Sequence, residues 1–134
     1  MKVKTADLIG PALDWAVGTA LNLPVEICQI FQYGRPNGEH YISIGETDKD
    51  GAEVTFEPSE EWSQGGPLIQ QECLDVRVFA EHGAPDGGPY WIAERYPSVG
   101  HGPTPLIAAM RCYCCAKLGE YTDIPEELCQ RANS

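Results

Sequence analysis

Residues 101–119 read HGPTPLIAAMRCYCCAKLG, and this stretch decides the fold because both of its ends carry helix signals. Thr104 is a residue type that caps the free amides of a first turn, and Pro105 suits the first helical position, where a missing N–H costs nothing. Gly119 suits the left-handed C′ position, and Lys117 in the last turn complements the helix dipole. We therefore predict a helix over residues 105–118.

The bulk properties indicate a small acidic domain. The chain has 134 residues, which suits a single domain over 1–134, and a formal net charge of −11, which argues against direct binding to nucleic acid. The N-terminal residues show no basic and apolar leader, and no apolar run is long enough to cross a bilayer. We therefore expect a cytoplasmic protein, with no membrane partner, whose six cysteines are free thiols.

The N-terminal half alternates between strand and helix signals. Residues 3–9 predict a short edge strand before a turn at Gly10, and residues 10–23 predict a helix with an apolar face. Two strands are predicted between 25 and 45, around the turn residues RPNG at 35–38. A polar turn at 46–52 then leads into another short strand over 53–58.

The C-terminal half predicts a helix, a hairpin and two more helices. Ser59 is placed to cap a helix that the Gly65–Gly66 pair should break, with Pro67 starting a second segment. Val76, Val78 and Ala80 alternate with Arg77 and Phe79, APDGGP at 84–89 provides a turn and YWIAERY returns, which predicts a β-hairpin over 75–97. After the 105–118 helix, Asp123 is placed to cap a short helix in which Leu128 faces inward. Helices packed on antiparallel strands give an α+β domain.

Three stretches together resemble a family of small phage and prophage proteins, the NinX-like proteins of unknown function. They are MKVKTADLIGPALDWAV at 1–17, PSEEWSQGGPLIQQE at 58–72, and HGPTPLIAAMRCYCCAKLGEYTDIPEEL at 101–128. The segment over about 25–51 looks longer and less typical, as a local elaboration would. The resemblance implies an α/β sandwich and expression inside an infected bacterium. It implies no established activity.

Cysteine chemistry is the first candidate activity for the 101–119 stretch. Cys112 and Cys115 are three residues apart on the predicted helix, but structural zinc sites usually draw Cys-x-x-Cys pairs from turns, with a second pair elsewhere. The other cysteines are scattered, and none of His40, His82 and His101 lies in a recognisable nucleophile signature. We therefore predict that these cysteines fill a core, that the chain holds no metal or cofactor, and that it is not an enzyme.

Ligand binding is the second candidate activity. Small, flexible residues precede two predicted helix N-termini, where free N–H groups and the helix dipole favour an anion. Exposed aromatic side chains nearby could stack on a planar ligand, and Tyr90 and Trp91 must point to opposite faces of their strand. The candidate ligand-binding residues are Trp62, Gly65, Gly66, Tyr90, Trp91, His101, Gly102, Thr104 and Arg111.

Three classes of function follow. The leading hypothesis is a non-catalytic phage accessory protein that captures a small anionic or nucleotide-like molecule, such as a host defence signal, and forms a homo-oligomer. The second is an acidic module that binds a host protein or imitates nucleic acid. The third is a cysteine- or metal-dependent enzyme. A pocket holding Trp62, Tyr90 or His101 would favour the first class, whereas clustering of Asp and Glu on one face would favour the second.

Overall fold

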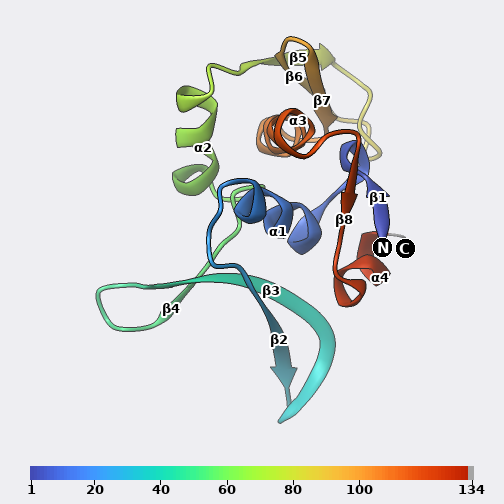
Figure 1. The fold of residues 1–134 in the computed structure, drawn as a ribbon. Helices are drawn as coiled ribbons and strands as arrows, with labels where there is room; N and C mark the ends of the chain where they lie inside the picture. The colour runs from blue at the N-terminus through green and yellow to red at the C-terminus, as the bar shows by residue number, and fades with distance from the viewer. Residues whose placement is uncertain (133–134) are drawn as a thin grey trace.

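The computed structural model describes residues 1–132, with side chains described through Cys129. Small sheets and helices alternate along the chain (Figure 1). The elements are β1 (Lys2–Lys4), the 3-10 helix η1 (Thr5–Asp7), α1 (Gly10–Ala20), β2 (Glu26–Gln32), β3 (Arg35–Thr47), β4 (Glu53–Thr55), α2 (Trp62–Gln71), β5 (Asp75–Ala80), β6 (Tyr90–Arg95), β7 (Ser98–Gly102), α3 (Pro105–Leu118), β8 (Tyr121–Asp123) and α4 (Glu126–Ala132).

The strands form three antiparallel sheets, with orders β1-β8, β2-β3-β4 and β5-β6-β7. The predicted α+β class is therefore confirmed, with three small sheets in place of the single sheet expected. The hairpin prediction is also confirmed, since β5 and β6 pair from Asp75 opposite Glu94 to Ala80 opposite Tyr90. None of the helices in the described part of the chain is both long and apolar enough to span a bilayer.

Helix α3 is the centre of the fold, as its sequence predicted. It runs from Pro105 to Leu118, and the Thr104 hydroxyl accepts the Ile107 N–H at 3.1 Å. The sheet β5-β6-β7 covers one side of α3 and α1 lies on the other (Figure 1). Most of its side chains are buried, including Cys112 and Cys114, so the interpretation of this stretch as core is confirmed. Gly119 follows with a positive φ of 89°, but its ψ of −169° is extended and not left-handed helical.

Strand β7 lies directly against the backbone of α3. A Cβ atom on Gly100 would lie 2.3 Å from the Ala108 carbonyl oxygen and 2.4 Å from the Cys112 nitrogen. Both distances are far below van der Waals contact, so only glycine fits here. This contact joins the sheet to the central helix.

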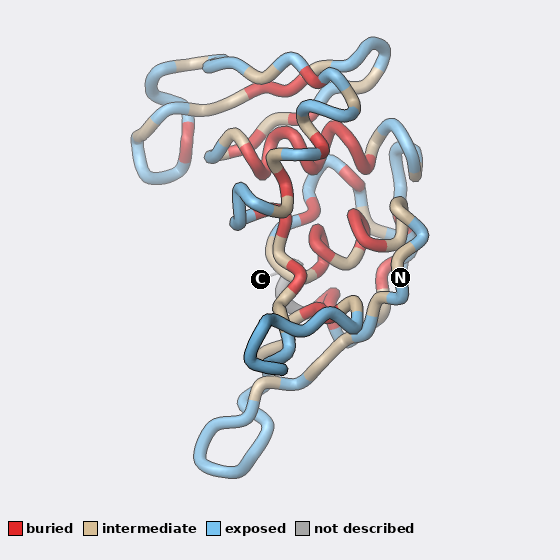
Figure 2. The backbone as a smooth tube through the Cα atoms, turned by 90° about the vertical axis from the view of Figure 1, so that its left-hand side faces the viewer, coloured by how far each residue is buried: buried red, intermediate tan, exposed pale blue. Residues whose placement is uncertain are grey.

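The hairpin of β2 and β3 extends away from the body as an arm (Figures 1 and 2), within the 25–51 segment that looked like an elaboration. Its turn is Tyr33–Gly34, with φ values of 53° and 75°, and not the predicted RPNG at 35–38, which lies inside β3. A two-residue turn with both φ values positive matches the twist of the flanking strands, and that geometry prevails over the turn preference of Pro36 and Asn37.

Helix α2 corrects two predictions. It starts at Trp62 and runs through Gly65, Gly66 and Pro67 to Gln71 without a break. Gly65 is present for packing, because a Cβ there would lie 2.2 Å from the Pro58 carbonyl oxygen. Ser59 is not the cap: it is buried before the helix, and its backbone N–H donates to Asp14.

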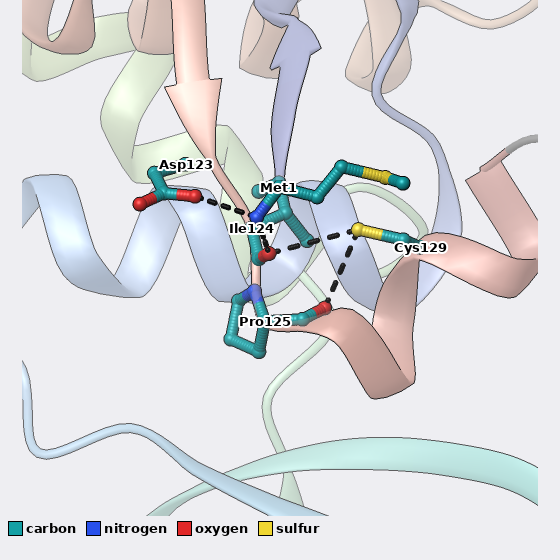
Figure 3. A network of polar contacts seen from close by, with 5 residues as sticks. All are labelled: Met1, Asp123, Ile124, Pro125 and Cys129. Carbon is teal, nitrogen blue, oxygen red and sulfur yellow. Dashed lines mark hydrogen bonds and ion pairs between the residues drawn. The ribbon is translucent and has the colours of Figure 1, made fainter.

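Two short strands near the C-terminal end were not predicted. β7 adds a third strand to the predicted hairpin and places His101 and Gly102 in a sheet. β8 pairs with β1, so Asp123 lies in a strand instead of capping a helix. Its carboxylate accepts from the N-terminal amine at 2.7 Å (Figure 3), which raises the pKa of the amine and lowers that of Asp123. Leu128 is buried in α4, as predicted.

Candidate functional site

A groove separates the β2–β3 arm from the body. Two adjoining cavities of about 350 Å³ and 200 Å³ form it, and Pro11, Ile30 and His40 line both. The N-terminal end of α1 supplies one wall, the arm supplies the opposite wall, and α4 closes one end. The groove therefore exists because the arm folds alongside α1, with Ile42 of β3 buried between them.

The groove is strongly acidic. No lysine or arginine lines either cavity in the part of the chain that the structure describes. The apolar part of the lining includes Ile30, Ile42 and Phe56. The carboxylates that line it are Asp14, Glu39, Glu57, Glu60 and Glu127.

Asp14 is the most unusual of these carboxylates because it is only 5% exposed. Its Oδ1 accepts the Ser59 backbone N–H at 2.9 Å, and the described residues offer it no ion pair with lysine or arginine. Burial raises the pKa of Asp14 to about 7, Ser59 opposes that shift, and the charges of Glu60 and Glu57 add to it. The ionised form of Asp14 is therefore a buried charge without a counter-ion among the residues whose side chains the structure describes.

Glu57 is held in place by the helix that follows it. The Gln64 side chain of α2 accepts the Glu57 N–H at 2.6 Å and donates to the Thr55 carbonyl at 2.9 Å. Burial and the neighbouring charges of Glu60 and Glu61 raise the pKa of Glu57. The groove thus holds two carboxyl groups that resist ionisation, and a bound cation would relieve both.

A separate cavity of about 230 Å³ brings together two of the predicted ligand-binding residues, Trp62 and Thr104. It lies at the start of α3, and the Trp62 side chain beside it is 56% exposed. However, Pro105 has no N–H, and the Ile107 N–H already donates to Thr104, so two first-turn positions offer nothing to an anion. Glu60 also lines this cavity. These features favour a neutral or cationic ring over an anion.

Three more predicted residues meet at the junction of α3 and the sheet. The His101 ring stacks with Tyr90 at 6.1 Å and meets Phe79 edge-on at 5.0 Å. The Arg111 guanidinium is buried, and it donates to the Leu8 carbonyl and to the His101 carbonyl, both at 2.8 Å. Burial lowers the pKa of Arg111, and nearby Tyr90 and Asp7 oppose that shift. Arg111 therefore holds the N-terminal segment and β7 against α3.

The remaining predicted residues lie in packing positions. Trp91 packs against the core, on the opposite face of β6 from Tyr90. A Cβ on Gly102 would lie 2.7 Å from the Ile107 side chain, and Gly65 is enclosed by Pro58 and Leu106. Gly66 is in the interior of α2, one residue from that contact. The structure therefore does not gather the nine predicted residues into one site.

The cysteines give little support for thiol chemistry. All six are free, and burial raises the pKa of Cys112 to about 11 and raises that of Cys114 further. Such thiols stay protonated and poorly nucleophilic near neutral pH. Within the described residues, no three His, Cys, Asp or Glu side chains are grouped so that they could hold a metal ion.

Sequence reasoning missed the groove residues Asp14, His40 and Glu57. One signal for Asp14 was present in the sequence: it lies three residues before Val17 and thus on the edge of the apolar face of α1. A carboxylate in that position is either buried or next to a buried surface. Glu57 and His40 carried no such signal, because only the fold brings them to α1.

The chain matches a known family of phage proteins. Residues 4–117 match the model of a family described as Bacteriophage P22, NinX. The match covers most of the chain, so the chain belongs to this phage family. No curated protein matches the chain.

Proposed function

We propose that this member of the phage NinX family is a non-catalytic binding protein, acting inside an infected bacterium, whose acidic groove receives a basic segment of a partner protein. The observation that carries the proposal is Asp14, a buried carboxyl that lines the groove without a cationic partner among the described residues. An uncompensated buried charge is costly, and a lysine or arginine from a partner would compensate it.

The lining of the groove fits the two parts of a basic side chain. Lysine and arginine carry long apolar stems below a charged head group. Pro11, Ile30 and Leu128 offer apolar surface for the stems, and Glu127, Glu60 and Asp14 offer acceptors for the head groups. Because two adjoining cavities form the groove, it has room for more than one basic side chain, as in a peptide segment.

The first experiment measures binding of a short oligolysine peptide by calorimetry at low salt. An acidic protein attracts a basic peptide over its whole surface. The groove variant and the control variant therefore remove the same number of negative charges. Glu60→Gln with Glu127→Gln removes two charges from the groove, whereas Glu81→Gln with Glu120→Gln removes two exposed charges elsewhere. We expect the groove pair to weaken binding at least tenfold and the control pair to change it little. Equal weakening by both pairs would assign the binding to net charge and refute the groove as the site.

A second candidate function is the capture of a small planar ligand without net negative charge, such as a nucleobase, beside α3. The shared cavity of Trp62 and Thr104 favours it, because an exposed indole is a stacking surface. Its test is titration with a nucleobase, and with the matching nucleotide for comparison, while the tryptophan fluorescence is followed in the parent and in a Thr104→Ala variant, with Trp62→Phe identifying the contribution of Trp62. Quenching that saturates in the parent and is lost in the variant would support this function over the groove.

A further inference from the structure

The outer edge of β2 is unpaired. β2 is the first strand of the sheet β2-β3-β4, and within the described residues its ladder partners all belong to β3. The strand is seven residues long, and Phe31 near its end is 62% exposed. An unpaired edge with exposed apolar side chains is a template for pairing with another strand.

The edge lacks the features that usually protect such strands. β2 reads EICQIFQ, with a single charge at Glu26 and neither lysine nor proline. Between Gln29 and Phe31 the ladder has one residue on β2 against three on β3, so the two extra residues of this irregularity lie on β3. By contrast, the edge strand β5 carries Asp75 and Arg77. The other edge of the arm sheet, β4, is only three residues long.

The sequence of β2 is self-complementary about its centre. If two copies pair antiparallel with Gln29 opposite Gln29, Ile27 lies opposite Phe31, and Cys28 lies opposite Ile30. At the ends Glu26 lies opposite Gln32, so no two like charges meet although each chain carries a net charge of −11. Opposed apolar pairs stabilise an antiparallel ladder, whereas opposed like charges destabilise it. With a two-fold axis through Gln29, each apolar residue of β2 therefore lies opposite an apolar residue, and no charge lies opposite a like charge.

We propose that β2 pairs with β2 of a second copy of this chain, antiparallel and centred on Gln29, so that two arm sheets become one continuous sheet. The partner is a second copy because the order of apolar and polar residues along β2 is nearly the same when it is read in the reverse direction. This interface lies on the edge of β2, whereas the acidic groove lies between the arm and α1; Ile30 of β2 also lines the groove, but the two proposals rest on separate observations.

The test compares two exposed phenylalanines by light scattering of the full chain. We expect the parent to be a dimer. Phe31→Lys should yield monomers, because Phe31 is exposed in the single chain and lysine on an edge blocks pairing. Phe79→Lys, at a side chain that is 60% exposed on the β5 strand, should leave the dimer intact. A monomeric parent, or a dimer that is lost with Phe79→Lys and kept with Phe31→Lys, would overturn the proposal.

Disulfide trapping tests the register. On a Cys28→Ser background, Gln29→Cys places two cysteines directly opposite each other across the two-fold axis, within the Cα separation that a disulfide spans. Mild oxidation should then link the two chains. Gln32→Cys on the same background places its cysteines far from each other in this register and should link poorly. Efficient linking through position 32 and not through position 29 would refute the centred register.

Discussion

The backbone N–H of Ser59 donates to Oδ1 of Asp14 at 2.9 Å, across 45 residues of sequence. This bond joins α1 to the segment that leads into α2, and it holds a carboxyl group at the base of the acidic groove. Because the surroundings favour the neutral form, with a pKa of about 7, this contact is coupled to pH.

The contribution of Asp14 to stability should fall as pH rises from about 4 to about 7. In this range the unfolded chain ionises Asp14 while the folded chain keeps its proton, so folding becomes less favourable with each unit of pH. The upper limit is about 4 kcal/mol, from a shift of about three units at about 1.4 kcal/mol each. Asp14→Asn keeps an acceptor for Ser59 but does not titrate. In urea unfolding, its advantage over the parent should be small at pH 5 and largest at pH 8, and a difference independent of pH would contradict the assignment.

The two neighbouring glycines of α2 should respond in opposite ways to alanine. Gly65→Ala forces a Cβ against the Pro58 carbonyl and should destabilise the fold by about 1–3 kcal/mol or more. Gly66→Ala meets only Trp62 at 3.6 Å and should stabilise it by about 0.5–1 kcal/mol, because alanine is the better helix former. The denaturant midpoints of the two variants, each compared with that of the parent, measure these changes. Shifts of the same sign would contradict the close contact between Gly65 and the Pro58 carbonyl.

Arg111 should contribute chiefly to stability. Lysine has a single ammonium group and cannot reproduce the fork that reaches both the Leu8 and the His101 carbonyls. Arg111→Lys should therefore cost about 1–3 kcal/mol, the penalty for leaving a buried acceptor unsatisfied. The control is Arg77→Lys, whose exposed ion pairs with Asp75 and Glu94 should change stability by less than about 1 kcal/mol. Comparable losses in the two variants would argue against the buried clamp.

Thiol labelling should follow burial. Cys73 is exposed and should react with a maleimide in the folded protein, whereas Cys112 and Cys114 are fully buried with raised pKa values and should react only on unfolding. Mass spectrometry of digests from native and urea-treated protein identifies the labelled positions. Rapid labelling of Cys114 in the native protein would contradict its place in the core.

Local signals predicted the parts of the fold that depend on local chemistry. Thr104 and Pro105 mark the start of α3 in any context, and the alternation around residues 76–80 marks a hairpin. Strand β7 could not be predicted in this way, since SVGHG contains two glycines and becomes a strand by lying against α3. The role of Gly65 also depends on a tertiary contact. Its sequence suggests a helix breaker, whereas in the fold it lies against the Pro58 carbonyl.

The candidate site was less accessible from sequence. Trp62 and Thr104 do share a cavity, but helix signals alone did not reveal that Pro105 and the Thr104 cap leave few N–H groups there. The acidic groove depends on Asp14, His40 and Glu57 meeting across three separate segments. Net charge indicated an acidic surface, and only the fold shows where the carboxylates gather.

The proposed groove should bind cations more tightly as pH rises. A bound lysine or arginine favours ionised Asp14, so binding releases a proton, and affinity should increase up to about pH 7 and then level off. Calorimetry of the oligolysine peptide from pH 6 to 8 measures this, and buffers of different ionisation enthalpy count the released protons. In Asp14→Asn the proton release should fall sharply, leaving only the part that Glu57 contributes. Because His40 lines the same groove and remains in the variant, that decrease would assign the linkage to Asp14, whereas unchanged release would assign it elsewhere and remove the main support for the groove.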